Sequence, residues 1–160
     1  KFAEIIYEFK KRERNKPLIL MGSEHKQLID YVHHSAKEDY DDIASKYWPG
    51  ALTVVIPASN KNNLTLTSSD ATLGLRIPNS YMAQALIKES GPLLTSSANI
   101  SGLKGAFTAE EIALDFPSVD ILGPVPWEKC SGKASTIISW EKSRTWKMIR
   151  KGELSIKESY

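Results

Sequence analysis

A run of basic residues near the start of the chain has the composition of an anion-binding segment. Residues 10–16 read Lys-Lys-Arg-Glu-Arg-Asn-Lys and lie between an apolar helical stripe and the strand-like residues 18–21. Arg12 has a planar fork that suits phosphate or carboxylate, and Lys10 and Lys16 add point charges. Flanking elements on both sides would hold a bound anion at a fixed point. The alternative is a solvated basic helix end that interacts favourably with the helix dipole.

A polar cluster follows an apolar run much further along the chain. Residues 93–95 read Leu-Leu-Thr, and Ser96, Ser97 and Asn99 come after them. Hydroxyl groups form adaptable hydrogen bonds, and an asparagine amide both donates and accepts. Together with the basic segment, these groups suit a phosphorylated or carboxylated small molecule. Ordinary loop chemistry is the alternative explanation of the cluster.

Arg76 lies near the end of a third candidate element. Residues 72–77 alternate as a strand does, which places Thr72, Gly74 and Arg76 on one face. An arginine flanked by leucine and isoleucine is costly to bury without an anionic partner. Arg76 therefore binds an anionic ligand or forms a structural ion pair, and the sequence leaves both open.

Two weaker candidates lie towards the C-terminus. Ser135 and Thr136 open one strand-like run, and Arg150 closes the last one, just before Gly152. Each has an ordinary alternative explanation. Ser135 and Thr136 fit the strand propensity of such residues, and Arg150 fits an exposed position at a sheet edge.

The chain lacks the patterns of covalent catalysis. No nucleophile, base and orienting residue form a recognisable set, and neither GxGxxG nor GxxxxGK[ST] occurs. No catalytic nucleophile or base is therefore expected, and a reaction run by positioning and charge stabilisation fits better, such as nucleotidyl transfer. The three histidines and the single cysteine, Cys130, have no metal-ligand spacing, so no metal site on the protein is expected.

Composition and hydrophobic periodicity predict one globular α/β domain over residues 1–160. The chain is 41% hydrophobic and 25% charged, and helical and strand-like stretches alternate along it, which favours a buried mixed sheet. The net charge of +2 is too small to predict nucleic-acid binding by itself. One cysteine is typical of a reducing compartment, and we expect the cytoplasm. No apolar run approaches the ~18 residues of a membrane span.

Six motifs, in order along nearly the whole chain, resemble those of the YrdC-like family of L-threonylcarbamoyladenylate synthases. The serine-alanine-asparagine motif is the most specific of them. The motifs are Lys10-x-Arg12 followed by Lys16-Pro17-Leu18-Ile19, Trp48-Pro49-Gly50-x-Leu52-Thr53, Gly74-Leu75-Arg76-Ile77-Pro78, Ser97-Ala98-Asn99-Ile100-Ser101-Gly102, Ser135-Thr136-Ile137-Ile138 and Ile149-Arg150-Lys151-Gly152.

The resemblance implies a fold, a reaction and a set of binding residues. The fold is a twisted, mixed parallel and antiparallel sheet flanked by helices. The reaction joins L-threonine, bicarbonate and ATP into threonylcarbamoyl-AMP and pyrophosphate, with Mg²⁺ accompanying the nucleotide, and a downstream tRNA-modifying transferase complex uses the product. By position, Lys10, Arg12, Lys16, Thr72, Asn99 and Arg150 would contact ATP, and Arg76, Ser97 and Ser135 would face threonine.

Two departures from the family pattern qualify this expectation. Glu13 stands where the family usually has proline after the arginine. The chain also begins inside the first recognisable helix, so the sheet is expected to lack the family's N-terminal strands, to expose an edge and to have impaired activity. Two alternatives remain: a non-catalytic RNA-binding module of the same fold, and a carbamoyl-adenylating domain of a maturation factor. The synthase interpretation predicts only weak RNA binding.

Overall fold

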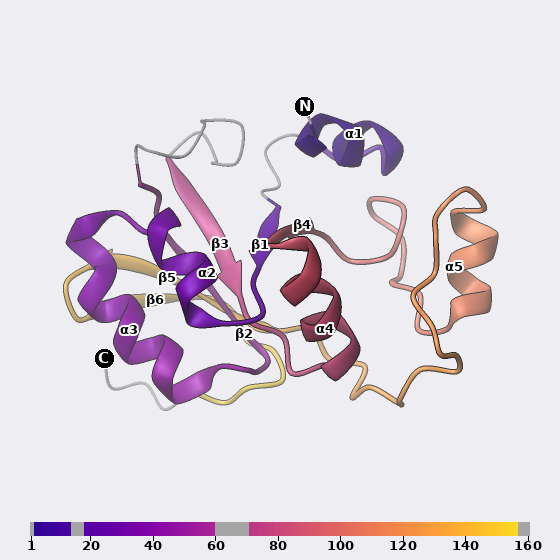
Figure 1. The fold of residues 1–160 in the computed structure, drawn as a ribbon. Coiled ribbons are helices and arrows are strands. Elements are labelled where there is room, and N and C mark those ends of the chain that lie inside the picture. The colour runs from indigo at the N-terminus through magenta and orange to yellow at the C-terminus, as the bar shows by residue number, and fades with distance from the viewer. Residues whose placement is uncertain (1, 14–17, 60–70, 157–160) are drawn as a thin grey trace.

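A six-stranded mixed sheet is the centre of the computed structural model, which describes residues 2–13, 18–59 and 71–156 (Figure 1). The strand order across the sheet is β4-β1-β3-β2-β5-β6. The strands are β1 Ile19–Met21, β2 Leu52–Pro57, β3 Thr72–Arg76, β4 Leu93–Thr95, β5 Thr136–Lys142 and β6 Thr145–Arg150.

Strand directions confirm the mixed sheet that the sequence predicts. β1 runs parallel to β3, and β2 runs parallel to β5. The pairs β1–β4, β2–β3 and β5–β6 are antiparallel. One end of the sheet therefore carries the C-terminal ends of β1, β3 and β6 together with the N-terminal ends of β2, β4 and β5.

Short helices connect the strands. In Figure 1, α2 and α3 cover the front of the sheet, whereas α1 and α5 lie towards the β4 side, where Phe9 stacks on Phe116 with ring centroids 5.2 Å apart. The helices are α1 Phe2–Phe9, α2 His25–Leu28, α3 Lys37–Tyr47, α4 Tyr81–Ser90 and α5 Ala109–Asp115, with 3₁₀ turns η1 Ile29–Tyr31 and η2 His34–Ala36.

The hydrophobic core lies between the sheet and the helices α2 and α3. Leu20, Val54 and Leu75 are neighbours on three adjacent strands, and all three are at most 3% exposed. They pack in one cluster with Leu28 from α2 and Tyr40 from α3. The alternation of side chains along each strand therefore assigns the residues between these positions to the opposite face of the sheet.

Helix starts differ from the sequence prediction at two places. We expect Ser23 and Asn79 to cap helices, but the N-cap residues are Glu24 and Ser80. The Ser23 hydroxyl instead donates to Gln27 Oε1 at 3.1 Å. The spacing of Leu28, Ile29 and Val32 predicts one helix through residue 32, but α2 is a single turn that continues as 3₁₀.

Other predictions of local structure are confirmed, with one exception. The spacing of Thr108 and Glu111 predicts a capping box, and the two residues form one. Gly91 is expected to stop the preceding helix, and it ends α4 with a positive φ of 79°. The apolar residues 119–122 also predict a strand, which is wrong, because this stretch pairs with no strand among the described residues and its apolar side chains are exposed. Residues 58–70 are rich in Asn, Ser, Thr and Lys, which predicts a surface loop, and most of them lie outside the described residues.

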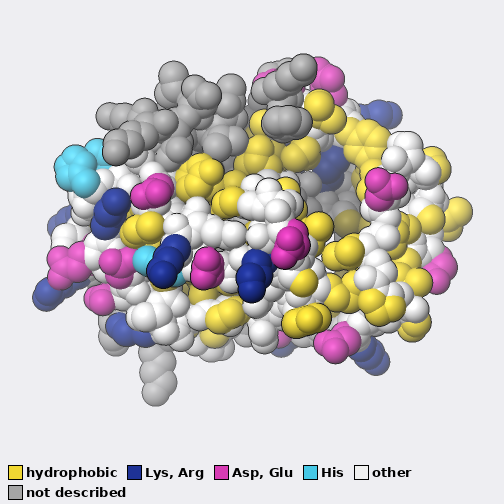
Figure 2. Space-filling view, in the orientation of Figure 1, with side chains coloured by type: hydrophobic (Ala, Val, Ile, Leu, Met, Phe, Trp, Pro, Cys, Tyr) yellow, Lys and Arg dark blue, Asp and Glu magenta, His cyan; other side chains and the backbone are white. Residues whose placement is uncertain are grey.

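Apolar side chains gather on the surface around α5. Figure 2 shows yellow side chains over the side of the molecule where α5 lies. Leu114 is 83% exposed, and Phe107, Leu122 and Val125 are each more than 40% exposed. A contiguous apolar surface of this kind favours association with another molecule or segment.

A buried carboxylate joins α3 to the β5–β6 hairpin. Asp39 is 7% exposed, and its Oδ2 accepts a hydrogen bond from Trp140 Nε1 at 2.7 Å. Both oxygens accept from the backbone N–H of Arg144, at 3.1 and 3.0 Å. The hairpin that leads to Arg150 is thereby fixed against the helix layer.

We expect Asp39→Asn to lower the free energy of unfolding by about 1–3 kcal/mol, because one acceptor oxygen becomes an amide that cannot accept these donors. Urea unfolding followed by circular dichroism measures the change. Asp42→Asn, at an exposed position of the same helix, is the matched control and should leave the midpoint unchanged. Equal midpoints for all three proteins would refute the tethering role of Asp39.

Candidate functional site

The sheet face opposite the core carries most of the predicted site residues. Leu73 and Leu75 enter the core, so Thr72, Gly74 and Arg76 point to the other face, as the alternation predicts. Ile137 pairs with Arg150 and belongs to the same face, because its neighbour Ile138 is in the core. These strands therefore present several polar groups to a single surface.

Arg76 is half-buried at the C-terminal end of β3, and its Nε donates to the carbonyl of Gly50 at 3.1 Å. Burial lowers the pKa of Arg76, the carboxylate of Glu153 opposes this change, and the cation of Arg150 reinforces it. The guanidinium thus lies in a field that already contains a second guanidinium, a setting that favours an added anion.

Arg150 and Ser135 are brought together by the β5–β6 pairing. Arg150 donates from Nε and Nη2 to the Ser135 carbonyl at 3.1 and 2.9 Å, and from Nη2 to the Ser135 hydroxyl at 3.2 Å. The Ser135 hydroxyl also lies 2.9 Å from the hydroxyl of Thr53, and both residues are buried. Arg76, Ser135 and Arg150 therefore form one cluster at one end of the sheet.

Gly152 allows the chain to pass close to this cluster. A Cβ atom at Gly152 would lie 2.3 Å from the Ala134 carbonyl oxygen and 2.4 Å from the Ser135 carbonyl carbon. The Gly152 N–H donates to the Thr136 hydroxyl at 3.1 Å, and that hydroxyl donates to the Leu154 carbonyl at 2.6 Å. A larger residue would push the C-terminal segment away from Ser135.

The turn of residues 48–50 positions Arg76 from the other side. The Gly50 N–H donates to the Ile77 carbonyl at 2.9 Å while its carbonyl accepts from Arg76. Trp48 holds the turn by donating from Nε1 to the Leu52 carbonyl at 2.8 Å. The turn and the end of β3 therefore hold each other by reciprocal bonds.

The second cluster joins the basic segment to the loop after β4. Lys10 is 6% exposed, and its Nζ donates to the Ser96 hydroxyl at 2.9 Å and to the Ser97 carbonyl. The Lys10 carbonyl accepts from the Ser101 N–H at 3.2 Å. Burial lowers the pKa of Lys10 to about 8, with a further contribution from the cation of Arg12.

Asn99 organises the loop from within. It accepts at Oδ1 from the Ser97 hydroxyl at 2.5 Å and donates from Nδ2 to the carbonyls of Ile100 and Leu103, at 2.9 and 2.7 Å. Its amide therefore fixes the loop conformation, while the exposed Ser97 and half-buried Asn99 remain at the surface.

The structure divides the predicted residues between two ends of the sheet. Thr72 begins β3 at the end where β4 leads into Ser97, and Arg76 ends β3 at the other. Four residues of a strand separate them by about 13 Å. Arg12 is half-buried beside Lys10 in sequence, and Lys16 lies outside the described residues.

Thr53 is a polar partner that sequence reasoning did not place in the site, whereas Ser96 was part of the predicted polar cluster. Thr53 stands between the core residues Leu52 and Val54, so its hydroxyl had to point to the opposite face. The alternation of core and non-core residues along β2 could therefore have identified Thr53 from the sequence. The direct bond from Lys10 to Ser96 had no signal in the local sequence, because only the fold brings the two residues together.

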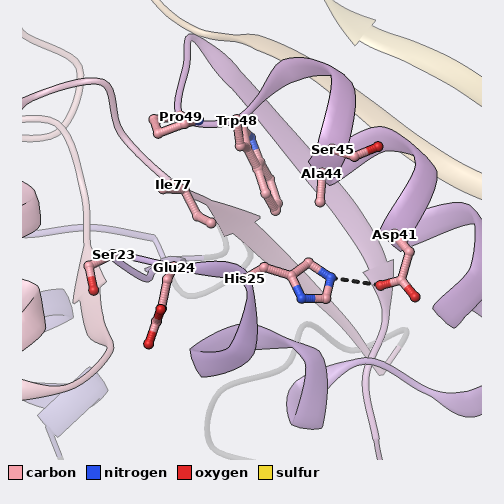
Figure 3. A pocket seen from close by; sticks show the side chains of 9 residues that line it. All are labelled: Ser23, Glu24, His25, Asp41, Ala44, Ser45, Trp48, Pro49 and Ile77. Carbon is pink, nitrogen blue, oxygen red and sulfur yellow. Dashed lines mark hydrogen bonds and ion pairs between the residues drawn. The ribbon is translucent and has the colours of Figure 1, made fainter.

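A hollow of about 440 Å³ lies elsewhere, between α2, α3 and the turn of residues 48–50 (Figure 3). Trp48 and Ile77 point into it, and His25 Nε2 lies 2.7 Å from Asp41 Oδ1 across from them. None of the predicted site residues is among those that line it.

Two further properties concern the described part of the chain. Its helices include none with the length and apolar character needed to cross a bilayer. No group of three or more histidine, cysteine, aspartate or glutamate side chains among the described residues is arranged to hold a metal ion.

The fold and the two polar clusters define an α/β protein with a basic, hydroxyl-rich sheet face. The family described as "Telomere recombination", which combines Sua5, YciO and YrdC proteins, matches residues 1–152. The chain therefore belongs to the Sua5/YciO/YrdC family.

Curated relatives carry the name threonylcarbamoyl-AMP synthase. That of Idiomarina loihiensis is 34% identical over 118 residues, which cover 72% of this chain and 63% of the relative. That of Bacillus subtilis is 37% identical over 112 residues, which cover 69% of this chain and 32% of the relative. The chain thus spans between about a third and two thirds of the length of these relatives.

Solved structures agree with the fold. P. abyssi Sua5 complexed with L-threonine superposes with a TM-score of 0.82 at 30% identity, covering 94% of this chain and 44% of that one. E. coli YciO superposes with a TM-score of 0.73 at 24% identity, covering 93% of this chain and 72% of that one. At this identity the likeness supports the fold and nothing further.

We expect Gly152→Ala to destabilise the fold by roughly 1–3 kcal/mol, because the added methyl meets backbone atoms that cannot rotate away. Chemical denaturation provides the measurement. Gly105→Ala is the control, since a Cβ there meets nothing within 4 Å, and it should unfold at the wild-type midpoint. A Gly152→Ala protein as stable as this control would show that the C-terminal segment can shift freely.

Proposed function

We propose that this protein acts as an L-threonylcarbamoyl-AMP synthase, making the adenylate and pyrophosphate from L-threonine, bicarbonate and ATP. The observation that carries the proposal is a cluster of Arg76, Ser135 and Arg150 at one end of the sheet, with a second cluster of Lys10, Ser96 and Ser97 beyond its other end. The names of the curated relatives support the same activity.

The proposed roles draw on both ends of the sheet, because Arg150 lies with Arg76 and Ser97 lies with Lys10. Arg12, Lys16, Thr72, Asn99 and Arg150 contact ATP, with Lys10 adding charge near the phosphates. Arg76, Ser97 and Ser135 face threonine or its carbamate. The guanidinium of Arg76 suits a carboxylate, because a planar fork matches two oxygens and burial strengthens the attraction.

The chemistry needs two bonds to form. The threonine amine attacks the carbon of bicarbonate, loses a proton and releases water to give a carbamate. A carbamate oxygen then attacks the α-phosphorus of ATP, and pyrophosphate leaves. The phosphate oxygens would carry Mg²⁺ as part of the nucleotide substrate, and fixed cations stabilise the charge on the leaving pyrophosphate.

The product is a small adenylate, and its consumer is a transferase complex that modifies tRNA. Tight RNA binding is therefore unnecessary in this domain, and a cytoplasmic location fits the reaction.

Synthesis of threonylcarbamoyl-AMP, followed by chromatography with labelled bicarbonate, tests the activity. Arg76→Gln should raise the KM for threonine about 10- to 150-fold, the equivalent of a lost charge-assisted bond of about 1.5–3 kcal/mol. Arg144→Gln is the control, since Arg144 is exposed and only its backbone N–H contacts Asp39. An unchanged KM in Arg76→Gln would exclude Arg76 from the threonine site.

Arg12→Ala should weaken ATP binding about 10- to 150-fold for the same reason. Titration calorimetry with Mg-ATP measures the change directly. Lys11→Ala removes a neighbouring charge whose side chain is exposed and should have a much smaller effect. If both variants bind ATP like the wild type, the nucleotide lies away from the basic segment.

A further inference from the structure

Lys10 is a buried cation whose hydrogen bonds go to neutral oxygens. Its Nζ donates to the Ser96 hydroxyl at 2.9 Å and to the Ser97 carbonyl, and the residue is 6% exposed. The backbone of the same residue is held by the Ser101 N–H. Buried charges are normally compensated by an opposite charge, and dipolar oxygens replace it only in part.

The surroundings of Lys10 add repulsion to this burial. The cation of Arg12 disfavours a second positive charge, and the titratable side chain of the loop after β4, Lys104, has the same sign and lies over the Phe107 ring, 5.5 Å from its centroid. The result is a pKa near 8 in the free protein, far below the ordinary value for lysine. The neighbouring charged side chains on its own segment are Glu8, Lys11, Arg12 and Glu13, and the loop supplies Ser96, Ser97 and Ser101.

We propose that binding of the ATP phosphates beside Lys10 is coupled to the uptake of a proton by its amino group. This inference rests on the proposed function, which brings the phosphates to the basic segment. A polyphosphate supplies the negative charge that the Ser96 and Ser97 oxygens do not. It therefore favours the ammonium form, and a new N–H bond forms on Nζ with a proton from solvent.

The direction of the pH dependence follows from linkage. Below about pH 8, Lys10 of the free protein is already protonated, so ATP binds without exchanging a proton. Above that pH, binding must first draw a proton from solution. The apparent affinity for ATP then falls by up to about tenfold per pH unit, until the pH reaches the raised pKa of the complex.

Titration calorimetry with ATP in pairs of buffers of different ionisation enthalpy tests the coupling, between about pH 7 and about pH 9.5. The wild type should take up almost no proton at the lower limit and approach about one near pH 9. Lys10→Arg keeps a charge over this range and should bind ATP with no uptake and a flat pH profile. Lys11→Arg, the control at the neighbouring exposed position, should behave like the wild type.

The outcomes separate the coupling from the proposed function. ATP binding without proton uptake in the wild type, or with uptake retained in Lys10→Arg, overturns the coupling and leaves nucleotide binding intact. Absence of ATP binding at every pH overturns both. If Lys10→Arg fails to fold, the titration of the Lys10 ε-carbon resonance decides instead: its midpoint should rise when ATP is added to the wild type, and an unmoved midpoint contradicts the proposal.

Discussion

The pairing of β3 with both of its neighbours is the constraint on which the candidate site depends. Gly74 lies opposite Ile19 of β1, and a Cβ at Gly74 would lie 3.4 Å from the Ile19 side chain and 3.5 Å from the Leu18 carbonyl oxygen. These are ordinary van der Waals distances, so the position of β3 is set by its ladder pairing with β1 and β2 on either side. A slip of one residue would turn Arg76 into the apolar core, where an unpaired cation costs several kcal/mol or more.

Both polar clusters hold cations with carbonyl oxygens. The Gly50 carbonyl holds Arg76, the Ser135 carbonyl holds Arg150, and the Ser97 carbonyl holds Lys10. A carbonyl dipole fixes the direction of a cationic side chain while leaving its net charge largely uncancelled. The cations are therefore positioned before any anion arrives, which is the arrangement that stabilises developing charge most effectively.

Local sequence signals predicted the elements well where one interaction dominates. The capping box of Thr108 and the glycine stop at Gly91 depend on neighbouring residues only, and both are confirmed. Ser23 and Asn79 failed as caps because another polar residue beside each, Glu24 or Ser80, takes the N-cap position. Which of two adjacent polar residues becomes the N-cap depends on where the preceding strand ends and the chain turns into the helix. Local sequence does not encode that position.

The face of the site was predictable, whereas its partners were not. Alternation in β3 was enough to place Thr72 and Arg76 on one side, and alternation in β2 could have added Thr53. The contact between Lys10 and Ser96 joins residues 86 positions apart, and it requires the antiparallel β1–β4 pair. Contacts of that range follow from topology, which no local pattern specifies.

The distance between the two clusters limits which ligands can contact both of them. A small anion would engage the cations at one end only, because about 13 Å of strand lies between Thr72 and Arg76. A molecule with two anionic or polar ends, such as a nucleotide next to an amino acid, can engage both. The strand between them is lined at its centre by Gly74, which presents backbone and no side chain to that face. Because Gly74 is itself buried, a ligand reaches the protein at the two ends instead, through exposed groups such as Arg150 and Ser97 whose positions hydrogen bonds already fix.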